Sequence, residues 1–368
     1  MSKKIIGLSK NMKIQSLINS NLQKVIAQNN GPYTTGSQKL FSKIKEIENL
    51  SKRINNKKIL VLGASGHLGS HIMRIMKIMG FSENVIGCSH RKESKGLIKL
   101  PIIDNQQLSR DLKIFINEHN PSIIINATAL ANPVTCNENE ALATLLNHTF
   151  AAELSKYSET SKIIHLSTEA VYDRTEMKNE LSENAAINMD ENSNRYVLSK
   201  YEGEKIFKGK PNSLILRLPN LIGEGSTSAA YSIYERLLQN ENISYIQNEY
   251  RMFGSTYEVA ASIILAAMKM LDNEALSGET INLLGPKQTT KYELINMIAE
   301  VNAIDNVKIR VQQDIPYRIK RYLLSTTKSH SFNIGLNITP KEALVLMRTG
   351  LQKNLKYKGS PIEKLSID

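Results

Sequence analysis

The sequence predicts an α/β fold built on a doubly wound parallel sheet. Three observations support this prediction. From residue 57 onward, short apolar segments alternate with longer segments of helical periodicity. The short segments are apolar at nearly every position, as parallel strands buried on both faces are. The first of them, residues 59–62, runs directly into a glycine-rich turn that a helix follows.

The elements follow one another along the chain. Strands are predicted at residues 59–62, 84–88, within 97–103, and at 122–126, 161–166 and 213–217. Helices are predicted over residues 67–79, 105–119, 139–158 and 195–208. Residues 175–194 have no periodicity and predict a long loop, which in a compact domain is usually functional or disordered.

Two amphipathic helical segments precede the first strand. The first spans residues 13–28 and ends at an Asn-Asn-Gly-Pro sequence, and the second runs from Leu40 to Ile54. We interpret residues 1–56 as a helical extension that caps the body or meets a partner. A cleaved organellar targeting segment within residues 1–45 is the alternative, because that stretch contains no acid, although it also lacks arginine.

The chain of 368 residues carries a formal net charge of +12, and the position of that charge limits what it implies. Residues 1–58 hold twelve basic and two acidic side chains, so residues 59–368 are nearly neutral. The basic segment has neither the interleaved aromatic residues nor the arginine-rich stripe typical of nucleic-acid binding. We therefore expect no nucleic-acid partner.

The cysteines and the apolar runs indicate the compartment. Cys88 and Cys136 cannot form a disulfide framework, and two isolated thiols are typical of a reducing compartment. No run approaches about 18 consecutive apolar residues, and the N-terminus lacks the apolar core of a secretory signal. We therefore expect a cytoplasmic protein with no membrane span.

Residues 63–69 read Gly-Ala-Ser-Gly-His-Leu-Gly, a GxxGxxG pattern between a strand and a helix. Glycines in this position let the chain turn tightly, let the backbone approach a pyrophosphate, and let the helix pack closely on the strand. The N-terminus of the helix adds N–H donors and a partial positive charge. The pattern predicts a Rossmann-like sheet that binds a dinucleotide.

The end of the second strand indicates which dinucleotide binds. An acid there would hold the ribose hydroxyls of NAD, whereas a basic residue suits the 2′-phosphate of NADP. No acid occurs before Glu93, while Arg91 can bind a phosphate through two N–H groups and Ser89 can donate a hydrogen bond. The sequence favours NADP(H), with NAD(H) left open and a solvated basic turn as the alternative. Asp104, after the third strand, suits either the adenine amino group or a helix N-cap.

Tyr196 and Lys200 form a Tyr-x-x-x-Lys pair on the helix after the fifth strand, which ends at Thr168. Residues four apart share a helix face, and at ~4 Å with an effective dielectric constant of ~20 the lysine favours the phenolate by about 4 kcal/mol before desolvation. The phenol pKa, ordinarily about 10, then falls toward neutral pH, where Tyr196 can exchange a proton with a carbonyl or hydroxyl that Thr168 also holds. The spacing is not specific by itself, because Tyr201 and Lys205 repeat it. We interpret Tyr201 as a half-buried packing residue.

Together these motifs resemble the extended short-chain dehydrogenase/reductases. The resemblance rests on the glycine loop, Asn126-Ala127-Thr128, residues 167–172, and Tyr196-x-x-x-Lys200-x-x-Gly203-Glu204. Within that superfamily, residues 216–220, 251–256, 278–294 and 324–328 make the chain most similar to the dTDP-4-dehydrorhamnose reductase and NAD-dependent epimerase group. The resemblance covers about residues 57–350.

The resemblance implies a division of the chain and a set of site residues. An NAD(P)-binding Rossmann domain spans residues 57–218, a smaller C-terminal α/β substrate-binding lobe partly interleaved with it spans 219–350, and a tail spans 351–368. Tyr196 is the implied proton donor, Lys200 the residue that holds the nicotinamide ribose, and Thr168 the residue that orients the ketone. The implied cofactor residues are Gly63, Ser65, Gly66, His67, Leu68, Gly69, Ser89, Arg91, Asp104, Asn126, Ala127, Thr128, Tyr196, Lys200 and Pro219. The implied substrate residues are Thr168, Glu169, Asn220 and Arg251.

The function implied is that of an NADP(H)-dependent reductase of a nucleotide-linked 4-keto-sugar. A nucleotide-sugar epimerase of the same family, or a non-catalytic cofactor-binding regulatory subunit, are the alternatives. The dehydratase relatives carry an Asp-Glu pair after the catalytic threonine, whereas Glu169-Ala170 provides one acid, which argues against a 4,6-dehydratase. Proline is absent at Ser255 and before Tyr196, and Val197 replaces a glycine, so the substrate stays open. A homodimer and a partner docked by the N-terminal extension are further expectations.

No metal site is expected. His67 and His71 share a helix face, but no further ligand accompanies them, so a surface or packing role is favoured for the pair. Cys136 has no base nearby in the sequence and is interpreted as an ordinary buried thiol.

Overall fold

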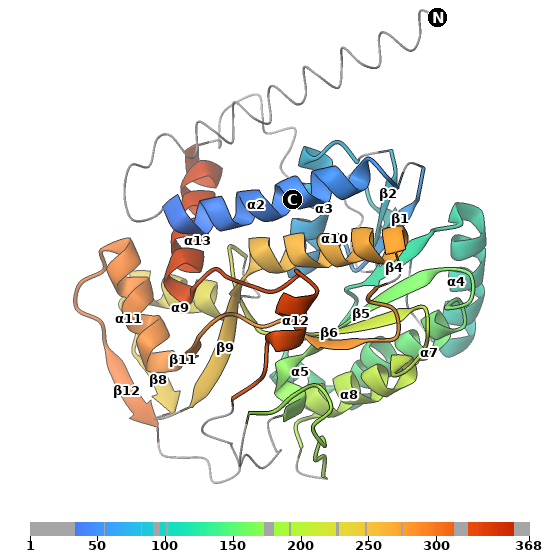
Figure 1. The fold of residues 1–368 in the computed structure, drawn as a ribbon. Helices are drawn as coiled ribbons and strands as arrows, with labels where there is room; N and C mark the ends of the chain where they lie inside the picture. Colours follow the sequence, from blue (N-terminus) through green and yellow to red (C-terminus); the bar gives the residue numbers. More distant parts are fainter. Residues whose placement is uncertain are drawn as a thin grey trace, which may run out of the picture.

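A seven-stranded parallel sheet forms the centre of the protein, with strand order β10-β6-β5-β4-β1-β2-β3 (Figure 1). The structure is a computed structural model that describes residues 34–356, except residues 55, 82, 91–95, 101, 103, 173–179, 191–192, 226–227, 247–248, 274 and 313–322. The strands of this sheet are β1 (Ile59–Leu62), β2 (Val85–Ser89), β3 (Ile98–Lys99), β4 (Ile123–Asn126), β5 (Lys162–Thr168), β6 (Ser213–Leu218) and β10 (Thr280–Asn282).

The order of the strands reverses between β1 and β4, which is where open α/β sheets bind their ligands. Leu62, the last residue of β1, is in register with Cys88 of β2 and with Asn126 of β4. The carboxyl ends of the three strands therefore meet at one edge. The loops that leave them, including the glycine-rich turn, share that edge.

Helices cover both faces of the sheet. On one face, α3 (His67–Ile78) and α10 (Thr256–Asn273) pack against the strands through a large apolar cluster. On the other face lie α4 (Asn105–His119), α7 (Phe150–Ser155) and α8 (Arg195–Phe207). The predicted doubly wound α/β fold is confirmed.

A smaller lobe lies beside the carboxyl edge of the sheet (Figure 1). It contains a three-stranded sheet of β11 (Gln288–Thr290), β9 (Tyr250–Ser255) and β7 (Asn220–Ile222), and a two-stranded sheet of β12 (Ile309–Gln312) and β8 (Ile243–Ile246). Its apolar core is closed by α9 (Ala229–Leu238), α11 (Lys291–Asn302) and α13 (Pro340–Lys356). Between these elements the chain returns to the large sheet as α10 and β10, and α12 (Thr327–Ser331) follows later.

The predicted elements are found with two differences. The helix predicted over residues 139–158 is α6 (Glu140–Thr144), a π-helical turn η1 (Leu145–Thr149) and α7, after the short helix α5 (Pro133–Glu138). The strand predicted within residues 97–103 is only two residues long. The helix predicted over residues 13–28 lies outside the described residues. No helix within the described part of the chain is both long and apolar enough to cross a membrane.

The second helical segment of the N-terminal extension is α2 (Thr34–Ser51), and it packs on α10 and α13. Ile47 and Leu50 are buried in the cluster that also contains α10. Lys43 is buried in the middle of the same face, and its ammonium donates hydrogen bonds to Ser262 Oγ at 2.7 Å and to the Gly335 carbonyl at 2.6 Å. Burial lowers the pKa of Lys43 to about 8, although Glu258, 3.9 Å away, opposes the shift.

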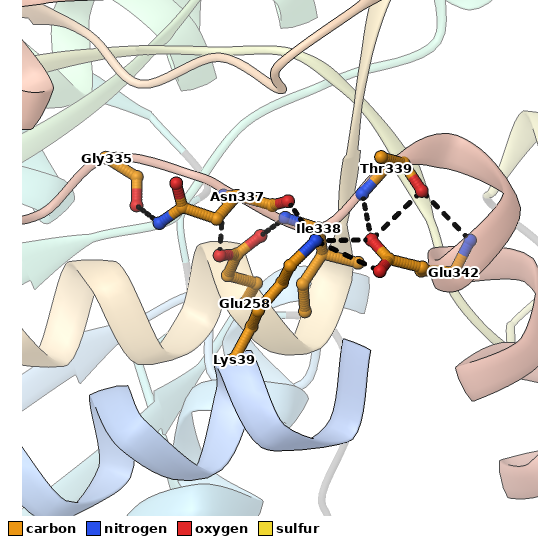
Figure 2. Close-up of polar contacts among 7 residues, drawn as sticks. All are labelled: Lys39, Glu258, Gly335, Asn337, Ile338, Thr339 and Glu342. Atoms are coloured by element: carbon orange, nitrogen blue, oxygen red, sulfur yellow. Dashed lines mark hydrogen bonds and ion pairs between the residues drawn. The ribbon is translucent and has the colours of Figure 1, made fainter. Parts of the chain in front are cut away.

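The contacts of α2 extend to the segment that leads into α13 (Figure 2). Glu258, fully buried on α10, accepts hydrogen bonds from the backbone N–H groups of Asn337 and Ile338 at 2.8 and 2.9 Å. Lys39 donates to the Asn337 carbonyl and to Glu342, which also accepts from the backbone N–H of Thr339. Helix α2 therefore contacts both α10, which packs on the large sheet, and α13, which belongs to the smaller lobe.

The burial of Lys43 gives a testable dependence of stability on pH. Because its pKa is lower in the folded than in the unfolded state, the unfolded state binds more protons between the two values, and stability rises with pH through that window. Relative to Lys43→Met, the wild type should gain about 2–3 kcal/mol of unfolding free energy between pH 7 and pH 10. Urea unfolding of both proteins at the two pH values measures this difference. Parallel pH profiles would contradict the burial of a charged Lys43.

Candidate functional site

The glycine-rich turn has the geometry of a phosphate loop. Gly63 has a φ of 75°, and a Cβ there would lie 2.6 Å from the Ala127 carbonyl oxygen. A Cβ on Gly69 would lie 2.2 Å from the Gly63 carbonyl oxygen, so α3 packs on the loop itself. Gly66 is the N-cap of α3 and offers no side chain to the first N–H groups of the helix. Those donors, with the positive end of the helix dipole, suit a pyrophosphate.

The polar residues predicted beside the loop lie along the same edge. Ser65 in the loop and Ser89 at the end of β2 share a hydrogen bond of 2.8 Å between their hydroxyls. Asp104 is the N-cap of α4, where its carboxylate accepts from the Gln107 N–H at 2.8 Å. It also lines a hollow of about 480 Å³ together with Ala141 and other residues. Arg91 lies outside the described residues.

The loop after β4 is held by a histidine that sequence reasoning missed. The buried Asn126 amide donates to His165 Nδ1 at 3.2 Å, and its oxygen accepts from the Thr128 N–H at 3.2 Å. Burial, assisted by the charge of Lys200, keeps the pKa of His165 well below its usual range, so the ring is neutral. His165 lies inside an apolar strand, and its sequence context gives no signal of this role.

Thr168, Tyr196 and Lys200 come from β5 and α8. Lys200 is 3% exposed, and its ammonium donates to the Leu166 carbonyl of β5 at 2.6 Å. Burial lowers the pKa of Lys200 to about 8, while Glu204 opposes the shift. Thr168 ends β5 and accepts from the Ala170 N–H at 3.2 Å. Tyr196, one turn before Lys200, is half-buried against an apolar cluster that contains Leu130, Cys136, Ala143 and Leu146.

A buried ion pair fixes α8 to the sheet. Arg217 of β6 and Glu204 of α8 are 2% and 1% exposed, and the Arg217 Nε–H lies 3.1 Å from both carboxylate oxygens. Ser167 donates to the same carboxylate at 2.8 Å, and Arg217 also donates to the Tyr172 hydroxyl. Each charge is buried with a partner and with further hydrogen bonds. Sequence reasoning included Glu204 and Arg217 in separate motifs but did not pair them.

The opposite side of α8 is fixed by a close approach to η1. A Cβ on Gly203 would lie 2.2 Å from the Asn147 carbonyl oxygen, so only glycine allows this contact. The Asn147 side chain donates to Ser199 Oγ at 2.9 Å and accepts from the Leu130 N–H at 2.8 Å. The π-helical turn therefore links α8 to the loop after β4.

Three of the predicted substrate residues lie directly after β5, on β7 and on β9. Glu169 is buried after β5 and accepts from the Asn220 side-chain amide at 2.7 Å, so the structure brings these two together. Pro219, buried between β6 and β7, precedes Asn220. Arg251 lies on β9 and donates to Glu249 at 3.1 Å.

The histidine pair and Cys136 have contacts within the protein. The His71 side chain is 3% exposed. His67 Nε2 lies within hydrogen-bond distance, 3.1 Å, of the Thr256 hydroxyl oxygen. Among the residues that the structure describes, no group of three His, Cys, Asp or Glu side chains could hold a metal ion. Cys136 is fully buried, its thiol donates to the Leu130 carbonyl, and burial raises its pKa, as expected of an inert thiol.

Known proteins share this architecture. The family model described as "RmlD substrate binding domain" matches residues 57–342. The methionine adenosyltransferase 2 subunit beta of Danio rerio is 27% identical over 249 residues, which is 66% of this chain and 73% of that protein. A probable low-salt glycan biosynthesis reductase of Haloferax volcanii is 31% identical over 174 residues, which is 46% of this chain and 55% of that protein.

Solved structures with low sequence identity have the same fold. A UDP-glucose 4-epimerase of Thermotoga maritima matches with a TM-score of 0.67 and 18% identity, covering 81% of this chain and 99% of its own. A dTDP-4-dehydrorhamnose reductase of Clostridium acetobutylicum matches with a TM-score of 0.63 and 23% identity, covering 80% and 99%.

The buried ion pair predicts a large cost for removing one partner. Arg217→Met leaves the Glu204 carboxylate buried without its counter-charge, and we expect a loss of about 3–5 kcal/mol in unfolding free energy. Adding Glu204→Leu to the same chain should recover part of that loss, because no buried charge is then left. Urea unfolding measures both.

Arg110→Met is the control, because Arg110 is 70% exposed and 3.9 Å from Asp111, a pair worth at most about 1 kcal/mol. If Arg217→Met and Arg110→Met had the same free energy of unfolding, the expected cost of breaking the Arg217–Glu204 ion pair would be wrong.

Proposed function

The chain belongs to the RmlD substrate binding domain family, and we propose that it is an NAD(P)-dependent reductase of a nucleotide-linked 4-keto-sugar. The observation that carries the proposal is the arrangement at the end of β5. There Lys200 of α8 is buried, one turn after Tyr196, and its ammonium donates a hydrogen bond to the Leu166 carbonyl. Leu166 lies on β5, two residues before Thr168.

The residues of the sheet edge fit a dinucleotide. The N–H groups at the start of α3 have no side-chain cap and are suited to a pyrophosphate. The absent Cβ atoms of Gly63 and Gly69 let the loop lie close to Ala127 and let α3 lie close to the loop. Ser89, Asn126 and the hollow beside Asp104 lie along the adjoining strand ends. The nicotinamide, when bound, supplies the hydride that reduces the sugar ketone.

The chain's own residues move the proton. Tyr196 donates its phenolic proton to the ketone oxygen as the carbon is reduced, and the nearby Lys200 ammonium stabilises the phenolate that remains. With a pKa of about 8, Lys200 is mainly charged at neutral pH and loses this effect in alkaline solution. Thr168 holds the same oxygen by a hydrogen bond. In the reverse direction, Tyr196 takes the proton of a sugar hydroxyl whose carbon gives its hydride to the oxidised dinucleotide, which is the first half of an epimerase reaction.

NADP(H) is the proposed cofactor, because Ser89 ends β2 and Arg91 follows two residues later, where NAD enzymes carry an acid. Structures of the same fold were solved with NAD, among them a UDP-glucose 4-epimerase of Thermus thermophilus, with 18% identity to this chain. The comparison supports a dinucleotide of this class, and the basic turn is the feature that favours the phosphorylated one.

A second candidate function is that of a subunit of another enzyme. The observation that favours it is the relative from Danio rerio, which is named as the beta subunit of a methionine adenosyltransferase and matches most of its own length. If the chain is such a subunit, the dinucleotide binds without taking part in a reaction. One face of α2 in the N-terminal extension already packs on α10, so that face is not available to dock a partner.

The proton donor is tested by Tyr196→Phe. Without the phenol, turnover of a nucleotide-linked keto-sugar should fall by at least about 100-fold, while NADPH binding measured by fluorescence persists. Tyr201→Phe is the matched control: Tyr201 has the same spacing to a lysine, and its ring lies 5.4 Å from the Lys205 ammonium, so its removal should leave turnover intact. Full activity of the Tyr196→Phe protein would refute the mechanism.

The cofactor preference is tested by Arg91→Ala. Loss of a guanidinium that binds the 2′-phosphate should weaken NADPH binding by about 10-fold or more and leave NADH binding unchanged. Titration of both dinucleotides against both proteins provides the measurement. An equal effect on NADPH and NADH would mean that Arg91 does not read the phosphate.

A further inference from the structure

One face of α3 connects the phosphate loop to the smaller lobe. His67, His71 and Arg74 lie on this face at successive turns. His67 Nε2 is 3.1 Å from Thr256 Oγ1, and Arg74 donates to Glu224 Oε1 at 2.9 Å. His71 Nε2 lies 3.7 Å from the same carboxylate oxygen. We call these five residues the α3 joint.

Both neighbours of Glu224 are glycines, and their backbone lies close to His67 and Thr256 of the joint. A Cβ on Gly223 would lie 2.4 Å from Thr256 Oγ1, and a Cβ on Gly225 would lie 2.9 Å from His67 Nδ1. Gly225 also has a φ of 128°, which other residues rarely adopt. The segment 223–225 can therefore lie against His67 and Thr256 only as glycine-Glu-glycine.

Three residues of the joint are buried, namely His71, Glu224 and Thr256. Burial raises the pKa of Glu224, but the interaction with the His71 ring and the hydrogen bond from the Tyr257 hydroxyl outweigh burial and leave the pKa at about 2. Burial, together with His71, lowers the pKa of His67 to about 4. His67 is therefore neutral and acts on Thr256 by a hydrogen bond, not on a pyrophosphate by charge.

The joint lies between the two halves of the proposed site. His67 is the first residue of α3, directly after the phosphate loop. On the other side, Glu224 follows β7, whose first residue, Asn220, binds Glu169. The Ser228 N–H then donates to the Gly225 carbonyl at 3.0 Å, and Ser228 caps α9 of the smaller lobe. The phosphate loop is thus connected to the smaller lobe through His67, Thr256 and the segment 223–225.

We propose that Thr256, held by His67, is a positioning residue that couples dinucleotide binding at the phosphate loop to nucleotide-sugar binding at the smaller lobe. The inference rests on the proposed function. A pyrophosphate on the loop fixes the first turn of α3 and with it the His67–Thr256 hydrogen bond. The segment 223–225 is then ordered before the second ligand arrives, so that ligand binds more tightly, and by linkage the effect is mutual.

The coupling is measured as the ratio of NADPH dissociation constants without and with saturating UDP or dTDP, which serve as probes of the nucleotide-sugar site. In the wild type we expect a ratio of about 5 or more. Thr256→Val, which removes the hydroxyl at nearly constant volume, should reduce the ratio to about 1, and Thr256→Ser should retain it. Thr280→Val, at the half-buried Thr280 of β10, is the matched control and should also retain it.

The outcomes separate this inference from the proposed function. If both probes bind the wild type but the ratio is 1, or if Thr256→Val keeps the full ratio, the coupling is wrong and the proposed function stands. If neither NADPH nor a nucleoside diphosphate binds the wild type, both fail together. Should Thr256→Val not fold by circular dichroism, His67→Leu removes the same hydrogen bond from the other side, and retention of the ratio there overturns the coupling.

Discussion

The buried ion pair of Arg217 and Glu204 is the interaction on which the candidate site depends. Neither charge is tolerable in the interior without the other, and Ser167 and Tyr172 satisfy the remaining hydrogen bonds. Because Arg217 belongs to β6 and Glu204 to α8, the helix cannot rotate or slide along the sheet without breaking the pair. Lys200, one turn earlier on α8, is thereby held against the end of β5.

The two faces of the sheet are anchored by different means. On the face of α8, charge pairing is combined with the glycine contact between Gly203 and η1, which sets the distance of the helix from the loop after β4. On the opposite face, the α3 joint and the buried Lys43 of α2 connect α3 and α10 to the smaller lobe. The carboxyl edge of the sheet therefore lies between two anchors, one that fixes α8 with Tyr196 and Lys200 and one that contacts both the phosphate loop and the segment leading to the smaller lobe.

The fold could be predicted from the sequence because strands buried on both faces are apolar throughout and the glycine loop is specific to one strand–helix turn. The Tyr196–Lys200 pair could be found for a related reason: its meaning comes from its place after β5, which the alternation of elements already indicated. Other features give no such signal. His165 is hidden in an apolar strand, and the π turn at η1 shifts the helical period by a single residue.

Charged residues in the core were the main source of missed contacts. Lys43 was counted with the basic appendage because a lysine is ordinarily solvated, yet it lies on the buried face of α2. The pairing of Glu204 with Arg217 joins residues 13 apart in separate elements, and only the packing of α8 on β6 brings them together. Periodicity does not record which buried charge meets which partner, since that depends on tertiary geometry.

The proposed keto-sugar reductase activity requires that a nucleotide-linked keto-sugar is reduced at the expense of NADPH. The most direct measurement is NADPH oxidation by the purified full chain against a panel of dTDP- and UDP-linked 4-keto-sugars, with the parent sugar nucleotides as blanks. We expect substrate-dependent oxidation with at least one keto-sugar and none with the blanks. NADPH binding without oxidation by any member of the panel would contradict it and favour the subunit function.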